Sequence, residues 1–363
     1  MKMPETKSIS VIVCAYNSGK TICKCLESLS RQRNIDPEKY EIIIIDDGSE
    51  DRTAELVKVF LNKNQNQLTE IRYVKVRHGG LSISRNTGML LARAPVIAYI
   101  DHDAVADAYW VAELLKAWES HPNADSIGGC IPVLNQENYL AKLLYDATYS
   151  KADKWAIIGT NMSFQRQRIM RTGGFCDLFV YRGDETYLFR KIGENAELVK
   201  WPQAIVYHKC PDNLLRWFRE RNDNGRLLVL IESLCEPKEI GILEKAIKNL
   251  TKIFLVLFMF IVFAWKWPIL CVVEIIWLLV RMVQSQVWQD IFYLRRKKHG
   301  IIQSLIDGCA AAIIMGCGDF FFNLGITNSY LKLYIKNAKK HIPLKCSMTK
   351  EYIIEELAAG GLK

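Results

Sequence analysis

Two aspartates one residue apart are the strongest candidates for chemistry in the sequence. Asp101 and Asp103 follow the short apolar run VIAYI, residues 96–100. In an extended segment residues i and i+2 point the same way, so both carboxylates could face one cation, or one of them a ribose. Carboxylate oxygens suit Mg²⁺ and Mn²⁺, and such an ion can screen the charge of a departing diphosphate. A turn with helix-capping aspartates is the alternative interpretation.

Two other polar clusters follow apolar runs nearer the N-terminus. Residues 14–17 (CAYN) end the first run, and residues 46–49 (DDGS) end the second. A carboxylate at a strand end can accept hydrogen bonds from a base or a ribose, and Gly48 allows a tight turn. Asp and Gly also form ordinary turns, so a turn remains the alternative.

The elements that would position these clusters alternate between strand and helix. The expected strands are residues 11–16, 41–46, 71–76 and 96–100, and the expected helices are residues 21–31, 53–61 and 87–92. Short β-branched runs alternating with helices predict an α/β fold with a mostly parallel sheet. Ligands of such sheets bind at the carboxyl ends of the strands, where all three clusters lie.

Several function classes are excluded by motifs that the sequence lacks. No G-x-G-x-x-G follows the first strand and no Walker pattern occurs, so neither NAD binding nor ATP hydrolysis is indicated. The 11 cysteines include no C-x-x-C, which argues against a zinc cluster and a disulfide framework and for a reducing compartment.

The net charge of +9 is concentrated after residue 235, where 17 basic residues stand against 10 acidic ones. These basic residues flank very apolar segments, which favours anionic lipid over nucleic acid as the partner. The apolar runs are residues 253–265, 268–283 and 301–326, in order of decreasing fitness to span a membrane. We therefore expect a membrane-associated helical region over 236–330, with a hairpin at about 250–283, and a basic cytoplasmic tail over 331–363. A buried helical pair in a soluble protein is the alternative.

Five segments together resemble the family 2 glycosyltransferases over about residues 8–226. They are VIVCAYN, IIIIDDGS, SISRNTGMLLARAPVIAYIDHDA, GTNMSFQRQRIMRTGGF and RGDETYLFRKI, in the order and spacing of that family. The resemblance implies a GT-A catalytic domain over residues 1–235. It also implies inverting transfer of a sugar from a UDP-, GDP- or dTDP-sugar, with Mg²⁺ or Mn²⁺ held by the Asp-x-Asp motif.

The resemblance assigns roles to individual residues. It implies nucleotide-sugar binding by Ala15, Tyr16, Asn17, Asp46, Asp47, Arg85, Asn86, Asp101 and His102. Metal binding falls on Asp103 and Asp101, with His208 as a candidate third ligand, and the acceptor side on Asn161, Gly173 and Gly174. Arg85 could contact the diphosphate or brace the Asp-x-Asp loop.

The catalytic base is where this sequence departs from its relatives, which commonly carry Gly-Glu-Asp. Here Gly183 is followed by Asp184 and Glu185, so the aligned base is Glu185 and Asp184 is the second candidate. We expect an extended loop in which one carboxylate faces the acceptor and the other caps a helix that begins near Thr186.

The apolar C-terminal region predicts a catalytic domain on the cytoplasmic face of a membrane. The expected acceptor is then a lipid-linked or membrane-proximal glycan, with no nucleic-acid partner. Two other functions remain open: a non-catalytic membrane subunit that binds nucleotide-sugar at a degenerate site, and a nucleotidyltransferase, which would lack its usual lysine-containing phosphate loop.

Overall fold

The computed structural model describes residues 7–65, 68–149, 159–193, 195–235 and 301–337, with isolated positions between 247 and 291. The chain divides into two compact units. The first contains the described residues within 7–134 and 159–209, and the second contains those within 135–149 and 210–337. The predicted catalytic domain ended at residue 235, so its last helix lies in the second unit.

An eight-stranded mixed sheet forms the centre of the first unit, in the order β3-β2-β1-β4-β7-β6-β8-β5. Its strands are β1 (Ile9–Ala15), β2 (Tyr40–Asp47), β3 (Glu70–Val76), β4 (Val96–Asp101), β5 (Ala104–Ala106), β6 (Ser126–Cys130), β7 (Asn161–Gln165) and β8 (Leu198–His208). The first four strands are parallel, which confirms the predicted sheet, and β7 joins β4 in the antiparallel direction.

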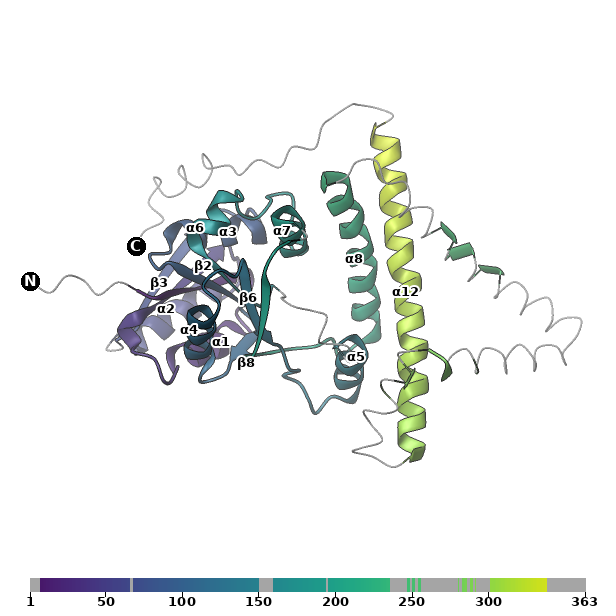
Figure 1. Cartoon of the computed structure of the whole chain (residues 1–363), viewed down its shortest axis with the longest axis horizontal. Coiled ribbons are helices and arrows are strands. Elements are labelled where there is room, and N and C mark those ends of the chain that lie inside the picture. Colours follow the sequence, from purple (N-terminus) through teal and green to yellow (C-terminus); the bar gives the residue numbers. More distant parts are fainter. Residues whose placement is uncertain are drawn as a thin grey trace, which may run out of the picture. The chain divides into compact units, whose positions relative to one another are not determined.

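Helices cover both faces of this sheet (Figure 1). One face packs on α1 (Ile22–Ser30), α2 (Thr53–Lys63) and α4 (Trp110–Ser120), and the other on α3 (Leu81–Leu91), α6 (Arg166–Arg171) and α7 (Asp184–Ile192). The short 3-10 turn η1 (Pro37–Lys39) precedes β2. Side chains alternate between the two faces along β1: Val11 and Val13 join the first core, and Ile12 joins the second.

Helix α3 begins six residues before the predicted helix over 87–92. Its first turn is held by contacts that are distant in sequence. Leu81 N–H donates to Val180 O at 2.7 Å, and Ser82 Oγ donates to Phe179 O at 2.8 Å. Gly80, at φ +96°, lets the two backbones approach, because a Cβ there would lie 2.8 Å from Val180 Cα. The serine-rich start of this helix has a weak local preference, so tertiary contacts decide where it begins.

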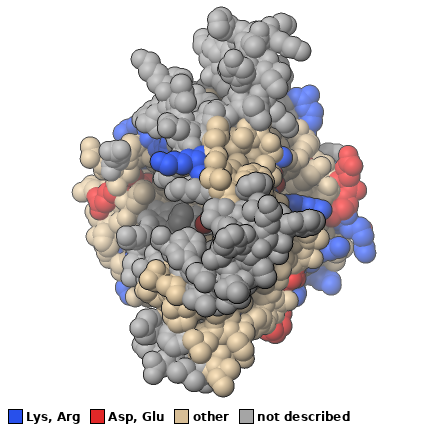
Figure 2. Space-filling model, turned by 90° about the vertical axis from the view of Figure 1, so that its right-hand side faces the viewer, with Lys and Arg blue, Asp and Glu red and all other residues tan. Residues whose placement is uncertain are grey.

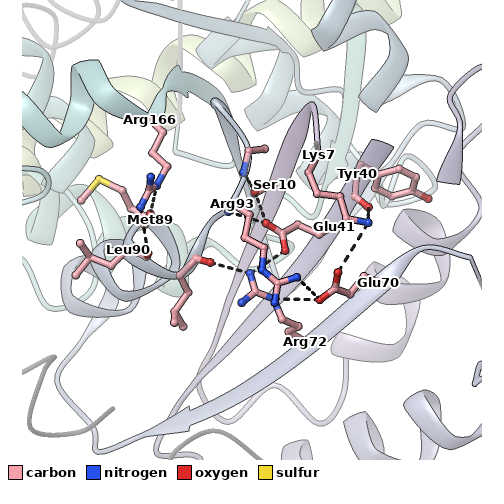
Figure 3. A network of polar contacts seen from close by, with 12 residues as sticks. Lys7, Ser10, Tyr40, Glu41, Glu70, Arg72, Met89, Leu90, Arg93 and Arg166 are labelled. Carbon is pink, nitrogen blue, oxygen red and sulfur yellow. Dashed lines mark hydrogen bonds and ion pairs between the residues drawn. The ribbon is translucent and has the colours of Figure 1, made fainter. Parts of the chain in front are cut away.

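The buried carboxylate of Glu41 connects the amino ends of the parallel strands through hydrogen bonds (Figure 3). Glu41 is fully buried and accepts from Ser10 Oγ at 2.6 Å, Arg72 Nη2 at 2.7 Å and the Arg93 backbone N–H at 2.8 Å. Arg93 also pairs with Glu70 at 2.7 Å. This network lies at the sheet edge opposite the three predicted site clusters.

Among the described residues of the second unit are the helices α5 (Tyr139–Tyr149), α8 (Leu214–Cys235) and α12 (Ile301–Asn337). Helices α8 and α12 cross at two glycines. A Cβ on Gly225 would lie 2.0 Å from Phe322 O, and one on Gly325 would lie 2.0 Å from Asn222 O. Only glycine allows this approach of the two backbones.

Residues Ile302–Ser329 of α12 are long and apolar enough to cross a membrane, by length and composition alone. A single helix of this kind is weak support for a membrane span. The predicted hairpin at about 250–283 lies almost entirely outside the described residues, as does the predicted tail beyond residue 337.

Candidate metal and carboxylate site

Asp101, Asp103 and His208 come together at the carboxyl end of β4. One ligand atom from each residue lies within 4.8 Å of the others. The pairing of β5 with β8 produces this arrangement. Ala104 lies opposite His208 in the sheet, so the histidine lies beside Asp103, the residue before Ala104. His208 Nε2 is 3.2 Å from Asp103 Oδ1. The structure thus brings together the two predicted metal-binding aspartates and the candidate third ligand.

The electrostatics of Asp103 keep it ionised. Burial alone would raise the pKa of this carboxyl, but the hydrogen bond and charge of His208, together with the charge of His102, outweigh burial and lower the pKa to about 2. Asp101 is fixed from the other side, because Thr160 Oγ1 donates to Asp101 Oδ2 at 2.5 Å. Two carboxylates and an imidazole, all partly exposed, are a donor set that fits Mn²⁺ or Mg²⁺.

Arg85 connects this cluster to the acidic pair. Its side chain is 3% exposed, with Nη1 at 2.7 Å from Asp184 Oδ2 and 3.7 Å from Glu185 Oε2, and Nη2 at 3.6 Å from Asp101 Oδ1. Burial would lower the pKa of the guanidinium, but the three carboxylates, Asp184 foremost, raise the pKa above its usual value. The Arg85 guanidinium therefore stays charged and lies between Asp101 of the Asp-x-Asp motif and the acidic pair.

The acidic pair lies in the first turn of α7, and the prediction of an extended loop was wrong. Gly183, at φ +88°, is the N-cap, and the helix begins at Asp184, two residues before the predicted start. The two carboxylates differ in access: the Asp184 side chain is 0% exposed and the Glu185 side chain is 21% exposed. Asp184 is committed to Arg85, whereas Glu185 can reach a solvent-borne group.

The pKa of Glu185 is raised to about 8. Burial is the main cause and the charge of Asp184 adds to it, while the charge of Arg85 acts in the opposite direction. A carboxyl with a pKa near the working pH is suited to take a proton from a hydroxyl group.

The ends of β1 and β2 lie side by side, as predicted. Ala15 pairs with Asp46 in the sheet. Asn17, at φ 49°, accepts from Glu50 N–H at 3.0 Å, and its own N–H donates to Ser49 Oγ at 2.9 Å. The amide of Asn17 thus joins the loop after β2 to the loop after β1.

Asp46 and Asp47 are buried and bonded within the protein. Asp46 accepts from Tyr73 Oη at 2.5 Å, and Asp47 accepts from Gly79 N–H at 2.8 Å and Gly80 N–H at 2.9 Å. His78 Nδ1 lies 2.8 Å from Asp47 Oδ2. Both carboxylates therefore hold the loops that follow β2 and β3 in place.

Tyr16 and His102 lie at the same edge of the sheet. The Tyr16 ring stacks on His78 with centroids 4.2 Å apart, and the His102 ring lies 3.0 Å from Thr21 Oγ1. His78 was not among the predicted site residues, although it stands two residues after the end of β3.

The side-chain amides of two asparagines predicted to lie in the site form hydrogen bonds within the fold. The Asn86 amide holds the backbone of Phe175, donating to its carbonyl at 2.8 Å and accepting from its N–H at 2.9 Å. Asn161 is fully buried, accepts from Trp110 Nε1 at 2.9 Å and donates to Ala204 O at 2.9 Å. The acceptor-side assignment of Asn161 therefore has to be corrected, because its amide is occupied inside the sheet.

Gly173 and Gly174 terminate α6 rather than open a surface. Their φ values are +85° and +72°, and Gly174 N–H donates to Ile169 O at 3.1 Å. This is a glycine helix end, so the pair has a structural role in the turn after α6. Through Asn86 and Phe175 the turn is also attached to α3.

Residues 10–171 match the model of the family described as Glycosyl transferase family 2. Among curated relatives, an uncharacterized glycosyltransferase EpsJ of Bacillus subtilis is 34% identical over 122 residues, which are 34% of this chain and 33% of that protein. A glucosyl-dolichyl phosphate glucuronosyltransferase of Haloferax volcanii is 25% identical over 224 residues, 55% of this chain and 69% of that protein. The chain thus spans about a third of the Bacillus relative.

A solved structure of mannosyltransferase PcManGT from Pyrobaculum calidifontis, in complex with GDP-Man and Mn²⁺, is similar at a TM-score of 0.49 and 16% identity, covering 98% of this chain and 87% of that one.

Proposed function

We propose that this chain, which contains a glycosyl transferase family 2 domain over residues 10–171, transfers a sugar from a nucleoside-diphosphate donor to an acceptor hydroxyl with inversion. The family match confirms the resemblance seen in the motifs, and the mixed α/β sheet is of the predicted GT-A class. The observation that carries the proposal is the meeting of two groups around Arg85: the Asp101, Asp103 and His208 cluster on one side and Glu185 on the other.

In this proposal the first group holds the metal ion. Asp101, Asp103 and His208 would be its ligands, with Thr160 orienting Asp101. When bound, a divalent cation there supplies charge stabilisation for the diphosphate leaving group. The nucleoside would lie at the edge formed by the ends of β1 and β2, where Asn17 and Asp47 fix the loops.

Glu185 is the proposed base. It would take the proton from the acceptor hydroxyl as that oxygen attacks the anomeric carbon opposite the leaving diphosphate. Asp184, fully buried against Arg85, would instead position the start of α7. The reversed order of the two acids is therefore compatible with catalysis, because the more exposed carboxylate occupies the second position.

We further propose a membrane-proximal acceptor. Ile302, Ile306 and Ile313 of α12 are 72%, 53% and 59% exposed at helical spacing, which suits contact with lipid. Most of the described surface in the view of Figure 2 is uncharged, with charged side chains in scattered groups. The Haloferax relative is named for a dolichyl phosphate-linked acceptor, which supports a lipid-linked glycan here.

Both acidic residues of α12 have partners within the second unit, as a helix in lipid requires. Asp319 pairs with Arg221 of α8 at 2.9 Å. Asp307 accepts from Tyr139 Oη of α5 and from Gln303 Nε2 at 2.7 Å. Basic residues that flank the apolar segments would place the catalytic domain on the cytoplasmic face.

A donor screen tests the proposal directly. The detergent-solubilised chain is incubated with UDP-, GDP- and dTDP-sugars, with and without Mn²⁺ or Mg²⁺, and release of the nucleoside diphosphate is measured beside Asp103→Ala. We expect metal-dependent release from one donor class by the wild type alone. Donor binding without turnover, even with lipid-linked acceptors present, would instead support the non-catalytic subunit.

A further inference from the structure

A cationic hollow lies at the end of the first unit away from the proposed reaction site. It measures about 440 Å³ and is lined by residues before β6, on β7, α6 and α7, among them Asp125, Phe164, Arg168, Arg171 and Lys191. Gln165, the last residue of β7, pairs with Val96, the first residue of β4. The metal cluster begins at the other end of β4, at its last residue, Asp101. Five residues of strand separate the two ends by about 17 Å.

One of the three cations is already fixed. Arg168 Nη1 donates to Asp125 Oδ1 at 3.2 Å and to Ala124 O at 3.2 Å. The same carboxylate accepts from Glu197 N–H at 2.9 Å. Both oxygens of Asp125 therefore accept hydrogen bonds. The Arg168 guanidinium is held in one orientation by its Nη1, and its Nε and Nη2 take no part in these bonds.

The other two cations are uncompensated. The side chains of Arg171 and Lys191 are exposed, and neither forms a hydrogen bond or ion pair with another residue of the part of the chain that the structure describes. Three cations against one carboxylate leave the hollow with two net positive charges. Phe164 and Ile169, both buried, contribute an apolar floor.

We propose that this hollow binds a phosphate monoester at a site separate from the donor and the metal. A phosphate monoester carries about −1.5 to −2 charges at pH 7, which matches the local excess, and arginine donates to its oxygens in pairs. The volume lies within the range of ligand pockets, about 300 to 1,000 Å³, and exceeds what the phosphate group alone requires. The organic part would rest on the apolar floor. A soluble phosphorylated metabolite and an anionic lipid headgroup share this chemistry.

The test compares two charge-matched variants. Arg171→Glu with Lys191→Glu alters the hollow, and Lys58→Glu with Lys63→Glu makes the same charge change on exposed positions of α2. The full chain in detergent, with EDTA to keep metal from Asp101 and Asp103, is titrated with glycerol 3-phosphate by calorimetry. Circular dichroism and melting temperature check folding, and Arg171→Gln with Lys191→Gln replaces the reversal if that variant does not fold.

Saturable binding by the wild type and the α2 variant, weakened at least tenfold in the hollow variant, supports a soluble ligand. A second arm measures co-flotation with phosphatidic acid vesicles and with phosphatidylcholine vesicles. Loss of the phosphatidic acid preference in the hollow variant alone supports a lipid headgroup. Absence of binding in both arms, or equal losses in the two variants, would overturn the proposal.

Discussion

Arg85 Nη1 lies 2.7 Å from Asp184 Oδ2, and this fully buried ion pair leaves two adjacent acids in different environments. Because Asp184 is committed to Arg85, the neighbouring Glu185 is the carboxylate left with solvent access. Replacing Asp184 should therefore have a different consequence from replacing Glu185.

Glu185→Gln is expected to lower kcat by about 10² to 10⁴-fold with little change in the melting temperature, since a general base contributes about that much. Asp184→Asn should lower the melting temperature, because a buried guanidinium loses its closest partner. Steady-state kinetics and thermal unfolding of both variants provide the check. Full turnover by Glu185→Gln would rule out this residue as the base.

The raised pKa of Glu185 predicts a specific pH profile. Only the deprotonated carboxylate can accept a proton, so kcat should rise about tenfold per pH unit below pH 8 and level off above it. Asp184→Asn removes a charge that raises this pKa, so its profile should shift to lower pH. A wild-type rate independent of pH between 6 and 9 would contradict the assignment.

Asp103→Ala should reduce metal-dependent turnover at least about 100-fold, as expected when a ligand of a charge-stabilising ion is lost. His208→Ala should have a smaller effect and raise the Mn²⁺ concentration needed for half-maximal activity. Metal titrations of turnover measure both. Lys58→Ala, on the surface of α2, serves as the control, and a metal requirement that is unchanged in Asp103→Ala would contradict the metal assignment.

Glu41→Ala should lower the free energy of unfolding by about 3–5 kcal/mol, because it removes one partner from a buried ion pair with Arg72. Glu70→Ala, on a neighbouring strand with a 37% exposed side chain, should cost less than about 1 kcal/mol. Denaturant unfolding compares the two. Equal losses would mean that burial of Glu41 does not matter to stability.

Gly80→Ala tests the attachment of α3 to the loop that precedes Asp184 and Glu185. Gly80 adopts φ +96°, and an added Cβ would lie 2.8 Å from Val180 Cα, so we expect about 1–3 kcal/mol of destabilisation. The loop before Asp184 would be displaced, so the KM for the acceptor should rise more than the KM for the donor. Gly316→Ala, where no neighbouring atom lies within 4 Å, is the matched control.

The sequence was informative where local pattern and tertiary structure agree. The apolar runs gave β1, β2 and β4, and the polar residues at their ends came together because parallel strands end at one edge. The approach of His208 to Asp103 depends on the pairing of β5 with β8, which links residues more than 100 positions apart. A pattern along the chain does not contain that pairing.

The differences between prediction and structure have the same origin. Asn161 lies in a segment that resembles a binding loop, but its side-chain amide forms hydrogen bonds with Trp110 and Ala204 inside the fold. The start of α3 depends on Val180 and Phe179, about 100 residues away. The order of exposure of Asp184 and Glu185 likewise follows from the placement of Arg85 and not from their sequence order.

Helix α3 has a mechanical consequence for the reaction. Through Arg85 it holds Asp101 and the start of α7, and through Asn86 it holds the turn at Phe175. Displacements of this one helix would therefore move the proposed metal ligand Asp101, the proposed base Glu185 and the turn at Phe175 in the same direction. The distances between these three groups would therefore vary less than if each group lay on an independent loop. Gly88 packs against Ile12 with no room for a side chain, so at this point α3 lies directly on β1.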